Sequence, residues 1–148
     1  MKTIGIDCRF AGTRSGLGRY TRAIVTELLR RNDSVQYVLC VRSENDEWLQ
    51  NAKKIAHCTL HIANFTHYSL AEQLLFPRVL RRSGIDLLFS PHFNVPLLCP
   101  VPFVATVHDL ILHRFPGNAS MLKRLAYRIQ MASTIRQAKR ILAFSTYT

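Results

Sequence analysis

The chain has 148 residues, of which 48% are hydrophobic, so it can bury one ordinary domain core and is too short for two. Its formal net charge of +11 comes from 20 lysines and arginines against 9 acidic residues. Such an imbalance indicates anionic partners rather than any particular fold. The apolar stretches are shorter than a membrane span, and the N-terminus lacks a signal-peptide pattern, so a cytoplasmic protein is expected.

The first predicted strand, residues 3–7, is followed by a glycine-containing turn and an amphipathic helix. Gly16 and Gly18 enclose Leu17 and are followed by Arg19. Glycine lets the backbone approach a ligand closely, and the first N–H groups of the following helix point at an anion. Two interpretations stay open: a phosphate-facing turn, or a tight strand-to-helix turn without a ligand.

Strands and helices alternate along the rest of the chain. The expected elements are a strand at 35–41, a short helix near 48–52, a strand near 59–62, a helix over 68–82, strands at 85–90 and 103–107, a helix over 120–138 and a strand at 140–144. Pro77 is expected to kink or split its helix, and Gly84 to end it. This alternation predicts an α/β fold, a Rossmann-like three-layer sandwich with a mostly parallel sheet.

Neither the cysteines nor the histidines near them indicate a metal site or another cofactor. The cysteines are Cys8, Cys40, Cys58 and Cys99. They are far apart and lie mostly among apolar residues, as small buried side chains in a reducing compartment do. His57 and His61 flank Cys58, but alternate side chains of a strand face opposite sides, which disfavours zinc.

Polar side chains follow three of the predicted strands. They are Asp7 and Arg9, then Ser90 and His92, then His108 and Asp109. Ligands of open α/β sheets bind beyond the carboxyl ends of the parallel strands, so these groups are predicted to line a cleft beside the glycine turn. For His108 and Asp109 the alternative is a capped turn, and for His92 it is a loop residue packed among prolines. The other histidines, His67 among them, are assigned structural roles.

The helix predicted over 120–138 carries the densest basic cluster. Its cations are Lys123, Arg124, Arg128, Arg136 and Lys139. They flank an apolar stripe made of Leu122, Leu125, Ala126, Ile129 and Ala132. We favour packing of this stripe on its own domain, and the alternative is contact with acidic lipid headgroups. Nucleic acid is disfavoured, because the basic residues are spread along the chain without interleaved exposed aromatics.

Five motifs, in a fixed order, resemble a known family. They are Gly5-Ile6-Asp7-Cys8-Arg9, Gly16-Leu17-Gly18-Arg19-Tyr20-Thr21-Arg22, Leu70-Ala71-Glu72-Gln73-Leu74, Asp86-Leu87-Leu88-Phe89-Ser90-Pro91-His92 and Thr106-Val107-His108-Asp109-Leu110. Together they resemble the N-terminal half of family 4 (group 1) glycosyltransferases, which have the GT-B fold. Cys8 stands where such sequences commonly have alanine, a tolerable small-for-small change.

The resemblance implies a transferase that moves a sugar from a nucleotide-sugar donor to a glycan or glycolipid acceptor, with retention of anomeric configuration and without a metal. Two Rossmann-like domains would face each other across a cleft. Residues 1–148 would be the N-terminal, acceptor-side domain, and the C-terminal nucleotide-sugar-binding domain is absent from this chain. The chain alone is therefore expected to be inactive, since group transfer depends on positioning by both walls.

The resemblance also implies roles for individual residues. The donor-phosphate residues would be Gly16, Leu17, Gly18 and Arg19. The acceptor site would be bordered by Asp7, Arg9, Ser90 and His92. His108 would contact the donor sugar near the reacting carbon, and Asp109 would orient the turn that holds it. No acidic residue is an obvious nucleophile, so the donor phosphate itself would help deprotonate the acceptor.

Two other classes of function stay open. A stand-alone binding module for an anionic glycan or lipid would explain the charge without any catalysis. A Rossmann-type oxidoreductase ranks last, because the third glycine of the dinucleotide fingerprint is missing. The resemblance favours polysaccharide or glycolipid assembly, and the basic helix favours an acceptor at the inner face of a membrane.

Overall fold

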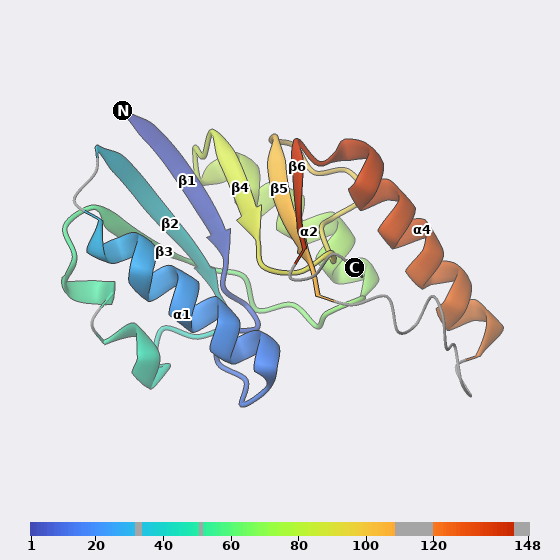
Figure 1. Cartoon of the computed structure of the whole chain (residues 1–148), viewed down its shortest axis with the longest axis horizontal. Helices are drawn as coiled ribbons and strands as arrows, with labels where there is room; N and C mark the ends of the chain where they lie inside the picture. Colours follow the sequence, from blue (N-terminus) through green and yellow to red (C-terminus); the bar gives the residue numbers. More distant parts are fainter. Residues whose placement is uncertain (32–33, 51, 109–119, 144–148) are drawn as a thin grey trace.

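The computed structural model describes residues 1–31, 34–50, 52–108 and 120–143 (Figure 1). The strands are β1 Lys2–Asp7, β2 Val35–Val41, β3 Cys58–Ile62, β4 Leu87–Ser90, β5 Phe103–Val107 and β6 Arg140–Ala143. The helices are α1 Gly16–Arg30, α2 Leu70–Arg82 and α4 Met121–Gln137, with the 3-10 turns η1 Glu47–Leu49 and η2 Ala52–Lys54. The short helix expected near 48–52 is thus two 3-10 turns.

One sheet joins all six strands in the order β3-β2-β1-β4-β5-β6, and every neighbouring pair is parallel. The chain moves outward from β1 to β3 on one side and from β4 to β6 on the other. The direction therefore reverses between β1 and β4. In open α/β sheets this switch point opens a crevice beyond the carboxyl ends of the strands.

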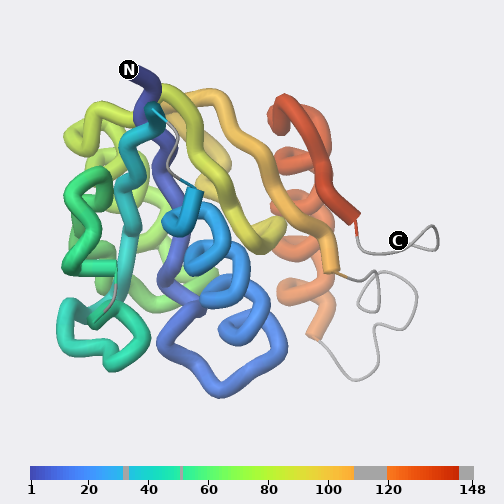
Figure 2. Tube along the Cα trace, turned by 60° about the vertical axis from the view of Figure 1, so that its left-hand side comes forward, coloured from blue at the N-terminus to red at the C-terminus, as the bar shows by residue number. Residues whose placement is uncertain are grey.

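Two apolar cores lie on opposite faces of the sheet, as expected for parallel strands covered on both sides. On one face, Val25 and Leu29 of α1 pack with Leu39 of β2. On the other, Phe76 of α2 packs with Val38, because neighbouring residues of a strand face opposite sides. Figure 2 shows α1 in front of the sheet and α2 behind it. The Rossmann-like three-layer prediction is confirmed.

Helix α2 runs through Pro77 without a break, so of the two outcomes expected for this proline, a kink or a split, the split does not occur. Proline removes one backbone hydrogen bond from a helix. Pro77 is buried together with Phe76 and Leu80, so packing of this face on the sheet outweighs the lost bond. Gly84, with φ 63°, follows the helix cap as predicted.

The apolar stripe of α4 does not pack on the described residues of its own domain, contrary to the interpretation that the sequence favoured. Leu122 is 76% exposed, Leu125 55% and Ile129 50%. The buried residues of α4 are Gln130, Met131 and Thr134. The inner face of α4 packs Met131 on Phe93 and on Val107 of β5, and it also serves the loop after β4, to whose backbone carbonyls Gln130 and Thr134 donate hydrogen bonds.

Candidate functional site

A row of aromatic rings lies at the switch point, beyond the carboxyl ends of β1, β4 and β5. We call Phe10, Tyr20, His92 and His108 the aromatic row. The centroids of His92 and His108 are 6.3 Å apart, and their planes are inclined by 26°. Phe10 lies 5.1 Å from His92, and Tyr20 meets His108 edge-on at 5.0 Å. Two histidines predicted from separate strand ends are thus brought together.

A backbone carbonyl holds the ring of His108. Its Nε2 lies 2.7 Å from the oxygen of Pro91, in the loop after β4. A carbonyl only accepts, so this bond requires Nε2 to carry a hydrogen and fixes one edge of the ring. The end of β4 therefore orients the histidine that follows β5. Asp109, expected to orient the same turn, lies outside the described residues.

Ser90 and His92 fold back on their own loop. The Ser90 hydroxyl is buried and donates to the carbonyl of His92 at 2.7 Å. Nδ1 of His92 accepts from the backbone N–H of Asn94 at 3.1 Å. Ser90 thus shapes the turn that presents His92, which is itself half-buried in the aromatic row.

Asp7 and Arg9 lie beneath this row, in a buried ion-pair cluster with Glu72 of α2. The Arg9 guanidinium donates to Oδ1 and Oδ2 of Asp7 at 2.8 and 2.7 Å and to Oε1 of Glu72 at 2.6 Å. Arg9 is 1% exposed and Asp7 2%. Their polar atoms are engaged inside the protein, so contact with an acceptor would require this cluster to open.

The cluster holds Glu72 and Arg9 in their charged forms. Burial alone raises the pKa of Glu72, but the contacts of its carboxylate with His67, Arg9 and Asn94 outweigh this and lower the pKa to about 2. Burial also disfavours the charged form of Arg9 and by itself would lower its pKa. The negative charges of Asp7 and Glu72 outweigh this and raise the pKa of Arg9 above its usual value. The Arg9 cation contacts both carboxylates, and Asn94 also donates to Glu72, and these contacts make the buried charges tolerable in the interior.

Helices α2 and α4 fix the loop that carries His92. Asn94 donates to Glu72 at 3.0 Å, and the Thr134 hydroxyl donates to the carbonyl of Phe93 at 2.7 Å. The side chain of Gln130 donates to the carbonyl of Val95. This loop lacks a strand partner for its backbone groups, and polar side chains of two helices supply the bonds instead.

The glycine turn before α1 is closed by contacts with its own backbone. Ser15 caps α1 by accepting from the N–H of Gly18 at 3.1 Å. A Cβ at position 18 would lie 2.9 Å from the carbonyl oxygen of Phe10 and closer still to that of Thr13, whereas one at Gly16 would meet nothing within 4 Å. Close packing of the loop therefore requires glycine at 18, independently of any ligand.

One comparison with known proteins decides the family. The sequence model described as Glycosyltransferase Family 4 matches residues 14–148, nearly the whole chain. The chain belongs to glycosyltransferase family 4. Searches of curated proteins and of solved structures gave no match. The wholly parallel Rossmann-like sheet is consistent with one half of a GT-B fold.

Several residues of this family 4 domain escaped the sequence analysis. Phe10 and His67 stack at 3.7 Å with planes 6° apart, and Nδ1 of His67 lies 3.6 Å from Oε1 of Glu72. His67 thus joins the aromatic row to the ion-pair cluster, although it had been assigned a structural role. No periodicity marks residues in a loop, so only the fold reveals this contact.

The outer side of α4 combines apolar and basic residues on the surface of the family 4 domain. Its exposed apolar side chains include Leu122, Leu125 and Ile129, and Arg128 and Arg136 are exposed beside them. The helix contains no acidic residue. Across the described ranges, no helix is long and apolar enough to cross a membrane. In the same part of the chain, no group of three metal-binding side chains is found.

Proposed function

We propose that this family 4 domain is the acceptor-side half of a retaining glycosyltransferase that uses a nucleotide-sugar donor and a glycan or glycolipid acceptor. The observation that carries the proposal is the pairing of His92 and His108 at the switch point, 6.3 Å apart. Ligands of open α/β sheets bind at this place. Flat rings also suit a sugar, since they pack on its apolar faces while their polar edges make hydrogen bonds.

In the proposed reaction, the bond between the anomeric carbon and the leaving phosphate oxygen breaks, and the acceptor hydroxyl bonds to that carbon on the same face. The hydroxyl proton passes to the departing phosphate oxygen. His108 contacts the donor sugar and stabilises the positive charge that develops on it. Because Pro91 holds Nε2, the ring is oriented before the substrate arrives, which is the arrangement that lowers a barrier.

The donor diphosphate lies, in this proposal, against the first turn of α1, at Gly16, Leu17 and Arg19. The N-terminus of a helix carries partial positive charge, and the N–H groups of its first turn have no intrahelical partner. The N–H of Gly18 already donates to the Ser15 side chain and that of Arg19 to the Ser15 carbonyl, so the N–H groups of Gly16 and Leu17 are those that would face an anion. No metal is needed for this compensation of charge.

The outer side of α4 is proposed to rest on an acidic membrane surface, where a lipid-linked acceptor would be presented. Exposed leucines beside arginines, without any carboxylate, suit insertion into anionic headgroups. Cosedimentation should be stronger with vesicles containing phosphatidylglycerol than with pure phosphatidylcholine, and Leu125→Gln should weaken it. Equal binding to both vesicles would contradict the placement of this side on an acidic membrane surface.

Transfer of labelled sugar tests the proposed function. The complete natural polypeptide, captured with an antibody against residues 1–148, should transfer sugar from one member of a nucleotide-sugar panel to a glycan or lipid extract, with retained configuration. The 148-residue chain alone should not. Robust transfer by the short chain would contradict its assignment as one half, and binding of anionic glycans without any transfer would favour a stand-alone binding module.

A further inference from the structure

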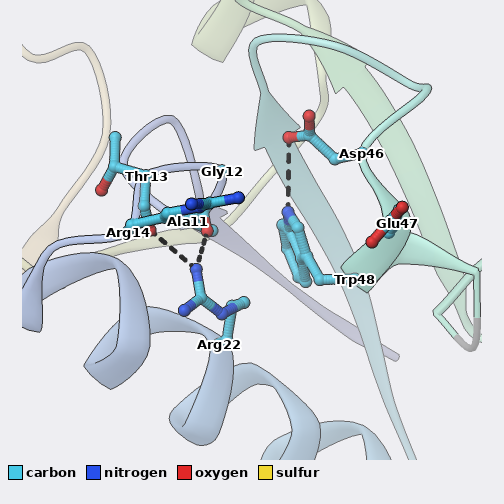
Figure 3. Close-up of a pocket in the computed structure, with 8 residues that line it drawn as sticks. All are labelled: Ala11, Gly12, Thr13, Arg14, Arg22, Asp46, Glu47 and Trp48. Carbon is cyan, nitrogen blue, oxygen red and sulfur yellow. Dashed lines mark hydrogen bonds between the residues drawn. The ribbon is translucent and has the colours of Figure 1, made fainter.

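A pocket that includes none of the aromatic row lies beside the loop that follows β1. It is a pocket of about 350 Å³ between this loop, the N-terminal part of α1 and the turn after β2. Figure 3 shows the side chains around it, among them Arg14 from the loop, Arg22 from α1, and Asp46, Glu47 and Trp48 from the turn. None of these residues belongs to the aromatic row.

The walls of this pocket are fixed by contacts within the chain. Arg22 donates to the carbonyls of Ala11 and Thr13, which pins the loop to α1 (Figure 3). Across the pocket, a Cβ at Gly12 would lie 2.8 Å from Oδ2 of Asp46. Glycine at position 12 therefore leaves room for the Asp46 carboxylate against the loop, and a larger residue there would displace this side chain.

The chemistry of the lining matches a neutral, polyhydroxylated ring. The indole Nε1 of Trp48 donates to Oδ2 of Asp46 at 3.3 Å and thereby orients that carboxylate (Figure 3). Carboxylates of Asp46 and Glu47 accept hydrogen bonds from hydroxyls, and the partly exposed indole offers an apolar face. Arg14 and Arg22 balance these two carboxylates, so the lining has no net charge that would select an ion, and a purely apolar ligand would desolvate all four charged groups without compensation.

We propose that this pocket binds a neutral sugar unit of the glycan acceptor, at a distance from the hydroxyl that reacts. The inference rests on the proposed function, which supplies the glycan. Phe10 of the aromatic row and Gly12 of the pocket belong to the same short loop, so a chain of sugars lying across that loop can occupy both places. Binding of remote units is a means of positioning the reacting group.

Trp48 provides the readout, because it is the single tryptophan of the chain. Neutral trisaccharides of glucose, galactose and mannose are titrated into the chain while its fluorescence is recorded. We expect a saturable change with at least one of them, weakened at least tenfold in Asp46→Asn. Glu44→Gln, an exposed carboxylate of the same turn outside the pocket lining, is the matched control and should bind as the wild type does.

Two results would overturn the proposal: no fluorescence change with any neutral trisaccharide, or tighter binding of uridine diphosphate than of every saccharide. In the complete protein, Asp46→Asn should raise the KM for a long acceptor and leave kcat unchanged. If Asp46→Asn leaves the KM of an active enzyme unchanged, the pocket does not bind the acceptor, and the proposed transferase function is unaffected. Saccharide binding in this pocket without any sugar transfer by the complete protein would support the pocket and contradict the proposed transferase function.

Discussion

At the scale of single residues, Glu72 connects most of the site. Its carboxylate accepts hydrogen bonds from Arg9, which follows β1, and from Asn94 in the loop after β4. Its Oε2 also accepts from the backbone N–H of Tyr68 at 2.6 Å. The surroundings of His92 are thus fixed by a buried charge on α2. A sequence motif containing this glutamate supported the resemblance, but only the structure shows which contacts require a glutamate at this position.

The pH dependence of stability should report this charge. The pKa of Glu72 is lowered from 4.5 to about 2, so its stabilising contribution is present above pH 4.5 and lost as the pH falls toward 2. At pH 7, Glu72→Gln should lower the free energy of unfolding by about 3 kcal/mol, because Arg9 loses a buried partner. Urea unfolding across this range should show the difference between the two proteins shrinking on acidification.

Glu27 provides the control for this comparison. It lies 3.6 Å from Arg30 on the surface of α1, with both side chains mostly exposed. Exposed pairs contribute little, so Glu27→Gln should leave the free energy of unfolding nearly unchanged at every pH. A difference between Glu72→Gln and the wild type that did not vary with pH would show that packing, rather than charge, is what Glu72 supplies.

At the scale of elements, the sequence predicted most helices and strands, because their apolar periodicity is set by burial on the sheet. It failed for the orientation of α4. Its inner face serves the loop after β4, with Gln130 and Thr134 bonded to loop carbonyls, so two of its three buried residues are polar and only Met131 is apolar. Periodicity alone assigns an apolar stripe to the core, and no local signal shows that the neighbour is a loop.

The start of α1 yields a prediction of its own. Gly18→Ala places a Cβ against the carbonyls of Phe10 and Thr13, which must move, at a cost of about 2 kcal/mol in the free energy of unfolding. Gly16→Ala has open space and should be neutral or slightly stabilising, since alanine favours helix. Equal losses in urea unfolding would mean that the loop yields more easily than its close contacts indicate.

At the scale of the whole molecule, the parallel sheet collects groups from distant parts of the chain at one edge. Alternation of strands and helices sufficed to predict that residues after β1, β4 and β5 would meet there. The alternation of elements could not show which of these residues lie at the surface and which are buried beneath it. His92 and His108 lie in the aromatic row, whereas Arg9 is covered, because burial of a charge depends on partners such as Glu72 that come from another element.

The most direct test of this account is the kinetics of His108→Ala in the complete glycosyltransferase. Loss of a contact made mainly in the transition state should lower kcat by about a hundredfold with little change in the KM for the acceptor. The matched control, His61→Ala on β3 at the far edge of the sheet, should retain kcat. An unchanged kcat for His108→Ala, or equal losses in turnover and acceptor binding, would contradict the placement of the reaction at this edge.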